Sequence, residues 1–376
     1  MEHYLDNSAT TKVCPEAAQA ALTAMTEIYG NPSSTHTKGR EAAKLLDTAR
    51  RQVVDAIGCK SPELVFTSCG SESDNWAILS GAEYNKRRGK HIISSTVEHD
   101  AVRKSLDELE RRGYEVTRLA PEPDGSVSAD SVAEALRDDT ILVSLMMVNN
   151  ETGGVTDIAG IARLLKKSGS KALLHTDAVQ AFMKIPFSAK TLGADMISVS
   201  AHKIHAPKGI GALYIRDGLK LRPFIVGGAQ ESGRRAGTEA MPQIAAFGAA
   251  CAAAKEAMNE SIQRTTALKR LACDMLRADI PEVRIVESGA PHILSISLPG
   301  WRSEVLMNYL EAREIYVSKS SACKKGGRSH VLEAIGLDAK TIDGAIRIGL
   351  SRFTTQEDIL ALCAALKEAR DTLAHN

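Results

Sequence analysis

The chain has few aromatic residues, no charge excess and no long apolar run. Phe, Trp and Tyr make up 4% of the 376 residues, and Lys plus Arg number 47 against 46 Asp plus Glu. No apolar stretch approaches the roughly 20 residues that cross a bilayer, and the start, MEHYLDNSATT, lacks the pattern of a secretory signal. Net charge therefore provides no general attraction to nucleic acid or anionic membranes. We expect a soluble, cytoplasmic protein with no membrane and no direct nucleic-acid partner.

Cysteine usage argues against a disulfide framework and a metal site. The seven cysteines are odd in number and scattered, and no two form a CxxC pair: they are Cys14, Cys59, Cys69, Cys251, Cys273, Cys323 and Cys363. We expect reduced thiols and no bound metal. A hydrolytic α/β enzyme is also disfavoured, because the sequence has no GxSxG motif and no cluster of metal ligands.

Short β-rich runs alternate with amphipathic stretches from about residue 62 onward. This alternation predicts βαβ units with a mostly parallel sheet and helices on both faces. The predicted strands there are ELVFTS, HIISST, YEVTRLA, ILVSLMMV, KALLHTD and ADMISVS. The Ala-rich segment from Met241 to about Leu276 predicts one long helix, which could join two domains. After it, VRIV, HILSISL and EIYVS predict strands of a smaller unit.

Polar residues follow several of the predicted strands, where ligands bind in an open α/β sheet. Lys203 comes soon after ADMISVS, and a lysine past a buried strand can lose its proton and form a Schiff base, although most lysines are simply exposed. Asp177 ends KALLHTD, where it could pair with a protonated pyridine nitrogen or cap a helix. Lys203 is thus the best candidate to bind an aldehyde cofactor.

Two further strand ends and one loop carry candidate groups. FTSCGSES offers backbone N–H groups and the Ser71 hydroxyl to a phosphate, or small residues for turn geometry alone. His99 in STVEHDAV could stack on a cofactor ring or serve a structural role. Cys323 lies in SKSSACKKGGRSH, a segment typical of an exposed loop, beside Lys324 and Lys325, which favour its thiolate. It is the cysteine placed like a nucleophile, although an incidental loop cysteine is the alternative.

Taken together, these segments resemble the NifS/IscS-like cysteine desulfurases, a branch of the class V aminotransferase group with the pyridoxal phosphate (PLP) fold type I. The resemblance rests on motifs in the same order along nearly the whole chain: YLDNSATT, NPSSTHTKGR, FTSCGSESDN, the EH of Glu98 and His99, VNNETG, HTDAVQ, SAHKIHAPKG, RRAGTEA, SSAC and RIGLSRFT. One position departs from the family pattern, because residue 69 is Cys where Gly is more usual.

The resemblance implies a role for each matching residue. Lys203 would bind pyridoxal 5'-phosphate and move the α-proton of L-cysteine, and Cys323 would take the sulfur as a persulfide. Arg347 would bind the substrate carboxylate with help from Asn31. The remaining cofactor contacts would be Asp177 at the pyridine nitrogen, His99 stacked on the ring, Gln180 at the phenolic oxygen with Asn150 nearby, Gly70, Ser71, Ser200 and His202 at the phosphate, and Thr238 reaching the phosphate of the partner subunit.

The same resemblance implies an α/β protein of PLP fold type I. Its large PLP-binding domain, over residues 15–252, would hold a mostly parallel seven-stranded sheet flanked by helices. A smaller α+β domain would combine residues 253–376 with residues 1–14. We expect a homodimer that passes sulfur by transient contact to an acceptor protein for iron–sulfur cluster assembly or tRNA thiolation. The alternatives are a selenocysteine lyase, another class V PLP enzyme, or a scaffold protein without catalysis.

Overall fold

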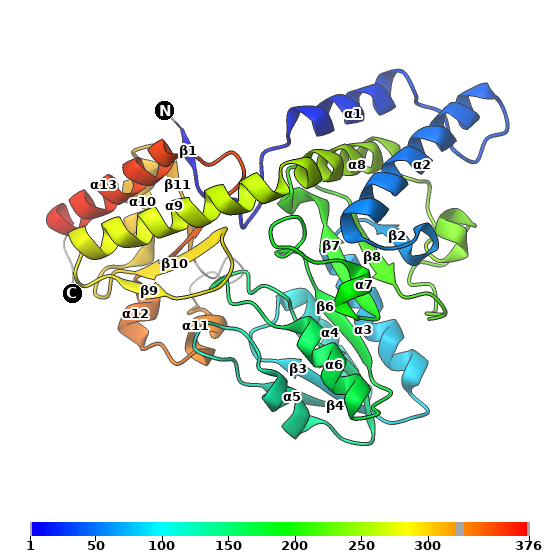
Figure 1. Ribbon diagram of the computed structural model, residues 1–376, viewed down its shortest axis with the longest axis horizontal. Coiled ribbons are helices and arrows are strands. Elements are labelled where there is room, and N and C mark those ends of the chain that lie inside the picture. Colours follow the sequence, from blue (N-terminus) through cyan, green and yellow to red (C-terminus); the bar gives the residue numbers. More distant parts are fainter. Residues whose placement is uncertain (1, 320–326, 374–376) are drawn as a thin grey trace.

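The computed structural model of the chain describes residues 2–319 and 327–373. A large α/β part and a smaller α+β part lie side by side, and two consecutive helices run along both (Figure 1). Within the described residues, no helix combines the length and the apolar character that a bilayer-crossing segment requires.

The large part is built on a seven-stranded, mostly parallel sheet, as predicted. The strand order is β2-β8-β7-β6-β5-β3-β4, and β8 runs antiparallel to both of its neighbours. Sequence patterns predicted every strand of this sheet except β8. The strands are β2 (Leu64–Thr67), β3 (His91–Ser95), β4 (Glu115–Leu119), β5 (Thr140–Ser144), β6 (Leu173–Asp177), β7 (Met196–Ser200) and β8 (Gly211–Ile215).

Helices cover both faces of this sheet, so its central strands are apolar on both sides. Neighbouring residues of β7 show the alternation: Met196 packs with Trp76 under α3, whereas Ile197 belongs to the core on the opposite face. The helices of this part are α1 (Pro15–Thr26), α2 (Thr37–Ile57), α3 (Gly70–Asn85), α4 (Asp100–Arg111), α5 (Ala129–Ala135), α6 (Ile158–Lys167) and α7 (Ala189–Leu192), with the short 3-10 helices η1 (Ser61–Glu63), η2 (Ala201–Lys203) and η3 (Gln230–Gly233).

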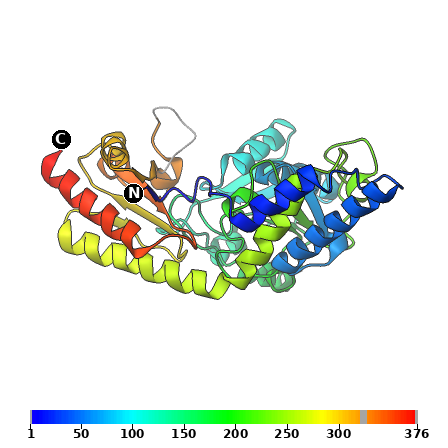
Figure 2. The ribbon, with the colours of Figure 1, turned by 90° about the horizontal axis from the view of Figure 1, so that it is seen from above.

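The single long helix predicted from Met241 to Leu276 is wrong, because two helices occupy this segment. They are α8 (Met241–Glu256) and α9 (Met258–Asp279), and Ala257 between them leaves the helical conformation, with φ −87° and ψ 1°. The two helices pack on different partners: α8 lies against α1 and α2, whereas α9 lies beside α13 (Gln356–Thr372) (Figure 2). Packing on two separate cores therefore overrides the uniform helix propensity of the Ala-rich segment.

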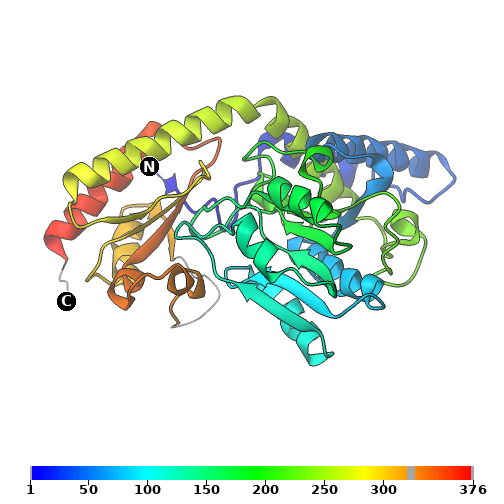
Figure 3. The ribbon, with the colours of Figure 1, turned by 60° about the horizontal axis from the view of Figure 1, so that its bottom comes forward.

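The smaller part contains an antiparallel sheet in the order β12-β13-β10-β9 and a two-stranded parallel pair, β1 with β11. The view in Figure 3 shows this sheet beneath α9. Its elements are β1 (His3–Tyr4), β9 (Arg284–Val286), β10 (Ile293–Ser297), β11 (Ile315–Tyr316), β12 (Ser318–Lys319), β13 (Ala345–Gly349), α10 (Ser303–Glu311), α11 (His330–Ala334) and α12 (Ala339–Asp343). The domain boundary predicted between residues 252 and 253 stays a prediction; that position lies within α8.

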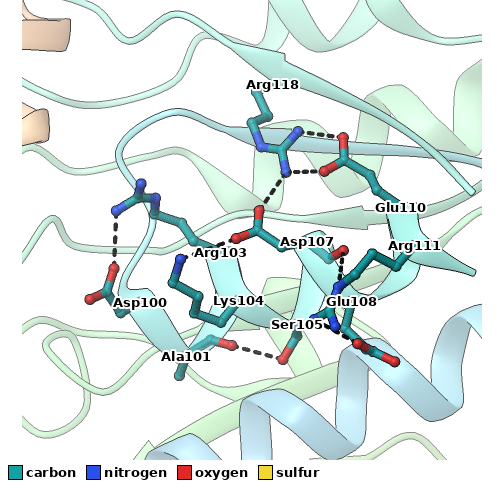
Figure 4. A network of polar contacts seen from close by, with 10 residues as sticks. All are labelled: Asp100, Ala101, Arg103, Lys104, Ser105, Asp107, Glu108, Glu110, Arg111 and Arg118. Atoms are coloured by element: carbon teal, nitrogen blue, oxygen red, sulfur yellow. Dashed lines mark hydrogen bonds and ion pairs between the residues drawn. The ribbon is translucent and has the colours of Figure 1, made fainter.

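Ion pairs on the outer face of α4 connect this helix to the sheet. Arg118 of β4 donates to both carboxylate oxygens of Glu110 at 2.7 Å and to Asp107 at 3.1 Å (Figure 4). Pairs exposed to this extent contribute little stability individually, but a network restricts how α4 sits against β4. The position of α4 matters because its N-cap residue is His99.

Candidate active site

Most of the predicted site residues meet in one cavity at the carboxyl ends of the parallel strands. This main cavity has a volume of about 370 Å³ and lies where β2, β3, β5, β6 and β7 end. Ligands bind in this position in open α/β sheets because the strand ends and the following loops leave a crevice there. The predicted residues that line it are Gly70, Ser71, His99, Asn150, Asp177, Gln180, Ser200, His202, Lys203 and Arg347.

Lys203 reaches the cavity from η2, directly after β7. Its Nζ donates hydrogen bonds of 2.6 Å to the backbone carbonyls of Ser8 and Ala9. Gln180 is tied to the same segment, since its Nε2 donates to the Ser8 carbonyl at 2.8 Å. The N-terminal segment therefore forms one wall of the site and holds both side chains in place.

Asp177 is the last residue of β6, and His99 lies in the loop after β3. Asp177 is buried, and one carboxylate oxygen accepts from the Val179 N–H at 2.9 Å. Burial raises the pKa of Asp177, while His99, that N–H and Lys203 oppose the rise. His99 accepts the Ala101 N–H at its Nδ1 at 3.1 Å, so Nε2 is the ring nitrogen that can donate to a ligand. A buried carboxylate of this kind is suited to receive a cationic group of a ligand.

The start of α3 forms a cradle opposite Lys203. A Cβ added at Gly70 would lie 2.9 Å from the Val179 side chain and 3.4 Å from the Ser200 Cβ, so only glycine fits without displacement. The Ser200 Oγ is buried and has no hydrogen-bond partner in the described part of the chain. Burial lowers the pKa of His202 to about 4, so its ring is neutral at neutral pH. Unpaired N–H groups of a helix start and an unpartnered hydroxyl suit a phosphate.

Arg347 enters the cavity from β13 of the smaller part. Its side chain is 3% exposed, donates to the Asn150 carbonyl at 2.8 Å and the Ser318 hydroxyl at 2.8 Å, and pairs with Asp6 at 3.3 Å. The Nε atom is buried without a partner among the described residues. These contacts fix a guanidinium at the cavity and leave its Nε–H and one Nη1 N–H for an anion.

Three predicted site residues do not line the main cavity. Asn31 lies exposed in the connection between α1 and α2, where its Oδ1 accepts the Ser33 N–H at 2.9 Å. Thr238 is exposed in the segment before α8. Cys323 lies outside the described residues. Their assigned roles stay predictions.

Three acidic residues of the cavity were missed by the sequence reasoning. Burial raises the pKa of Asp74 well above its ordinary value, that of Glu98 to about 8 and that of Glu151 to about 7. Each lies within a motif quoted for the resemblance, but acidic side chains on such segments are usually exposed. Only the fold shows that these three are enclosed beside Asp177 and line the same cavity.

Glu98 gives the protein a pH-dependent stability. Its Oε1 accepts from the Ser95 hydroxyl at 2.6 Å and the Met146 N–H at 3.1 Å, while Oε2 has no partner among the described residues. Since burial raises its pKa to about 8, the folded chain keeps a proton that the unfolded chain releases near its ordinary pKa of about 4.3. We expect the melting temperature to contain a component that falls from pH 5 to pH 8.

Glu98→Gln should make this decrease smaller when melting temperatures are measured by calorimetry at several pH values. The exposed Glu134→Gln is the matched control and should keep the slope of the wild type. An unchanged slope in Glu98→Gln would show that other groups cause the pH dependence.

The cavity fits the cofactor that the sequence led us to expect. An aldehyde needs an amine, which Lys203 supplies, and a pyridine nitrogen needs a buried acid, which Asp177 supplies. The helix start at Gly70, with the unpartnered Ser200 hydroxyl, suits a phosphate group. These three features lie around one space large enough for a compact heterocycle.

Comparison with known proteins identifies the family. The family model described as aminotransferase class V matches residues 3–362. A cysteine desulfurase of Trichormus azollae is 42% identical, with 98% of this chain and 93% of that protein covered. The cysteine desulfurase IscS of Methanosarcina thermophila is also 42% identical, covering 95% and 89%. A solved structure of a NifS-like protein superposes with a TM-score of 0.93 at 36% identity, covering 99% of this chain and 100% of that one.

The match of the family model extends from β1 into α13, so it includes both parts of the fold and every strand that borders the main cavity. The structural similarity likewise covers nearly all of both chains. The chain therefore belongs to the class V aminotransferase family, in its branch of NifS/IscS-like cysteine desulfurases.

Proposed function

We propose that this protein is a PLP-dependent cysteine desulfurase that converts L-cysteine into L-alanine and leaves the sulfur as a persulfide on Cys323. The observation that carries the proposal is the convergence of Lys203, Asp177 and Arg347 on one cavity, from both parts of the fold. An amine for an aldehyde, an acid for a pyridine nitrogen and a guanidinium for a carboxylate are together the groups that an amino-acid-converting PLP enzyme needs.

Different residues of the main cavity would bind the cofactor and the substrate. When bound, PLP supplies an aldehyde that links to an amine and a ring that accepts electrons as the α-proton leaves. Asp177, His99 and Gln180 would hold the ring, while Gly70, Ser71, Ser200 and His202 would hold the phosphate. Arg347 would pair with the substrate carboxylate through its unpartnered Nε side, with Asn150 at its other edge.

Lys203 would have a second role when its amine is not linked to the cofactor. Its Nζ can take the α-proton of cysteine and later return a proton, because the same nitrogen is held at the cavity by the Ser8 and Ala9 carbonyls. In the net reaction a Cys323 thiol and cysteine give a Cys323 persulfide and alanine. The Cβ–Sγ bond of the substrate breaks, a sulfur–sulfur bond forms at Cys323, and the substrate carbon gains a proton.

The surroundings of the other cysteines support Cys323 as the nucleophile. Burial raises the pKa of Cys14 and Cys273, raises that of Cys251 strongly, and raises those of Cys59 and Cys363 to about 12. Thiols of raised pKa hold little of the nucleophilic thiolate at neutral pH. Among the described cysteines, Cys69 is thus the remaining competitor, and it borders the main cavity.

A homodimer is part of the proposal. Two apolar side chains near the end of α1 are exposed, Leu22 by 48% and Met25 by 56%, and Tyr29, which follows the helix, is exposed by 67%. A second exposed apolar run, Phe224 to Val226, precedes η3. Monomeric proteins rarely leave such patches in water. Analytical ultracentrifugation should give twice the chain mass; a monomer at micromolar concentration would contradict this assignment.

The acceptor of the sulfur is proposed as a class only. A persulfide passes its outer sulfur by attack of another thiol, so an acceptor protein with an accessible thiol would complete the cycle. Iron–sulfur cluster assembly and tRNA thiolation both begin with this transfer. A radiolabelled sulfur transferred from cysteine to an added acceptor, and not to its Cys-less variant, would support the assignment.

The activity itself is tested with the purified holoenzyme, L-cysteine and a thiol reductant. We expect sulfide and alanine to appear in a ratio of one to one. L-selenocysteine serves as the competing substrate that distinguishes a selenocysteine lyase. Turnover of selenocysteine with none of cysteine would replace the proposed function by the alternative, and turnover of neither would leave a protein that only binds PLP.

A further inference from the structure

A second, smaller cavity lies behind Lys203, on the side away from the main cavity opening. This rear cavity has a volume of about 30 Å³, two to three times the roughly 10–15 Å³ that one water molecule needs. Residues of η2, α8 and α9 line it, together with residues just before β10 and just after β13. The side chains that give it chemical character are Lys184, Lys203, His205, Thr265, His292 and Arg352.

Two nitrogen-bearing side chains border the rear cavity without hydrogen-bond partners. His292 is 2% exposed, and neither ring nitrogen makes a hydrogen bond within the described residues, although the Gln180 carbonyl lies near the ring. The Nε of Arg352 is also buried without a partner there. Unsatisfied buried donors of this kind are uncommon and cost free energy unless a ligand or water accepts from them.

Lys184 adds an amine to the rear cavity, and this amine has one hydrogen-bond partner within the described residues. Its Nζ donates to Gln180 Oε1 at 3.1 Å. Burial lowers its pKa well below the ordinary value, and the positive charges of Lys203 and Arg347 add to this effect. The cavity thus lacks the negative charge that normally accompanies a buried lysine.

Acceptors are few around this space. Among the described residues, no carboxylate lines the rear cavity. His205 has its Nδ1 occupied by the Lys12 carbonyl at 2.8 Å, and the Thr265 hydroxyl already donates to the Ser261 carbonyl at 2.8 Å. Glu16 interacts electrostatically with Arg352, but it is not part of the lining.

We propose that the rear cavity is a binding site for one small monovalent anion of the chloride class, held by Lys184, His292 and Arg352. A single anion satisfies donors from three separate connecting segments, and it compensates the Arg352 guanidinium, which cannot lose its proton. The small volume favours a monatomic anion over a larger oxyanion. The alternative is one or two waters beside a neutral Lys184, which would satisfy the donors without charge compensation.

The rear cavity adjoins the main cavity, because Lys203 borders both and Gln180 of the main cavity contacts Lys184. Lys184 donates to Gln180 Oε1, and Gln180 Nε2 donates to the Ser8 carbonyl that also accepts from Lys203. An anion that keeps Lys184 charged strengthens its bond to Gln180, because charged donors form stronger hydrogen bonds. Lys184 and His292 are therefore positioning residues in this proposal and do not touch the substrate.

Anomalous diffraction tests the proposal directly. Crystals of the holoenzyme grown without halide are soaked in sodium bromide, and data are collected at the bromine absorption edge. We expect an anomalous peak within hydrogen-bond distance of Lys184 Nζ and the His292 ring. Density without an anomalous peak at this place identifies water and overturns the proposal.

Thermal unfolding of the holoenzyme provides a second readout. In sodium chloride the melting temperature should exceed that in sodium gluconate of equal ionic strength by roughly 1–3 °C, since gluconate is too large for the cavity. Lys184→Met should lose this difference, whereas the exposed control Lys166→Met should keep it. Equal melting temperatures of the wild type in both salts overturn the proposal, whether or not Lys184→Met folds.

Discussion

Cys323→Ala should bind the cofactor and L-cysteine as the wild type does, yet release no sulfide. The substitution removes the sulfur that accepts the transferred atom and leaves every residue of the main cavity unchanged. We therefore expect the rate of sulfide formation to fall by on the order of 10³-fold or more, because no other group of the proposed machinery can take over a covalent step. The measurement is sulfide release together with the cofactor's visible spectrum, before and after addition of cysteine.

Cys69→Ala is the matched control for this experiment. Cys69 borders the main cavity and accepts a weak hydrogen bond from the Ser68 hydroxyl at 3.7 Å, so it is the described thiol best placed to substitute for Cys323. We expect Cys69→Ala to keep most of the activity. The opposite pattern, with an active Cys323→Ala and an inactive Cys69→Ala, would show that the nucleophile is Cys69 at the start of α3.

Lys203→Ala should lose both the covalent attachment of the cofactor and the movement of the α-proton. The Lys203 Nζ is held by two backbone carbonyls at 2.6 Å, and alanine in that position cannot supply an amine. General acid–base catalysis alone contributes typically 10²–10⁴-fold, so we expect alanine formation to fall by at least about 10³-fold. The loss should appear in kcat more than in KM, since Arg347 still binds the substrate carboxylate.

Lys208→Ala is the control for Lys203→Ala because this lysine is exposed five positions later in the chain. It should keep full activity. Treatment of each holoenzyme with borohydride, followed by peptide mapping, shows which lysine carries the cofactor. A labelled peptide in Lys203→Ala that contains another lysine would contradict the assignment of Lys203.

The strand ends of the large sheet could be predicted from the sequence because they combine two local signals. Asp177 and Lys203 each come at or just after the end of a short run of apolar and β-branched residues. Parallel strands such as β6 and β7 end at the same edge of the sheet, so both side chains are expected at that edge. β8 was missed because GALYI follows the turn PKGI and no α-helix separates it from β7, so it lacks the βαβ context that marked its neighbours.

Other features depend on contacts that no local pattern contains. The bend at Ala257 results from two cores that meet only in the folded chain. The carbonyls of Ser8 and Ala9 bind a lysine almost 200 positions away, and nothing in YLDNSATT indicates that backbone oxygens would do so. Glu98 and Asp74 belong to recognisable motifs, but their enclosure depends on how β3 and α3 are packed.

The N-terminal wall of the main cavity has a consequence for the order in which the protein is made. β1 pairs with β11, and His3 contacts Asp358 at 2.8 Å, so the segment around β1 meets these partners only after residue 358 has been translated. Contacts of such long sequence separation form late in folding. Lys203 and Gln180 therefore gain their contacts with the Ser8 carbonyl only after β11 and Asp358, which lie more than 100 positions further along the chain, have been translated.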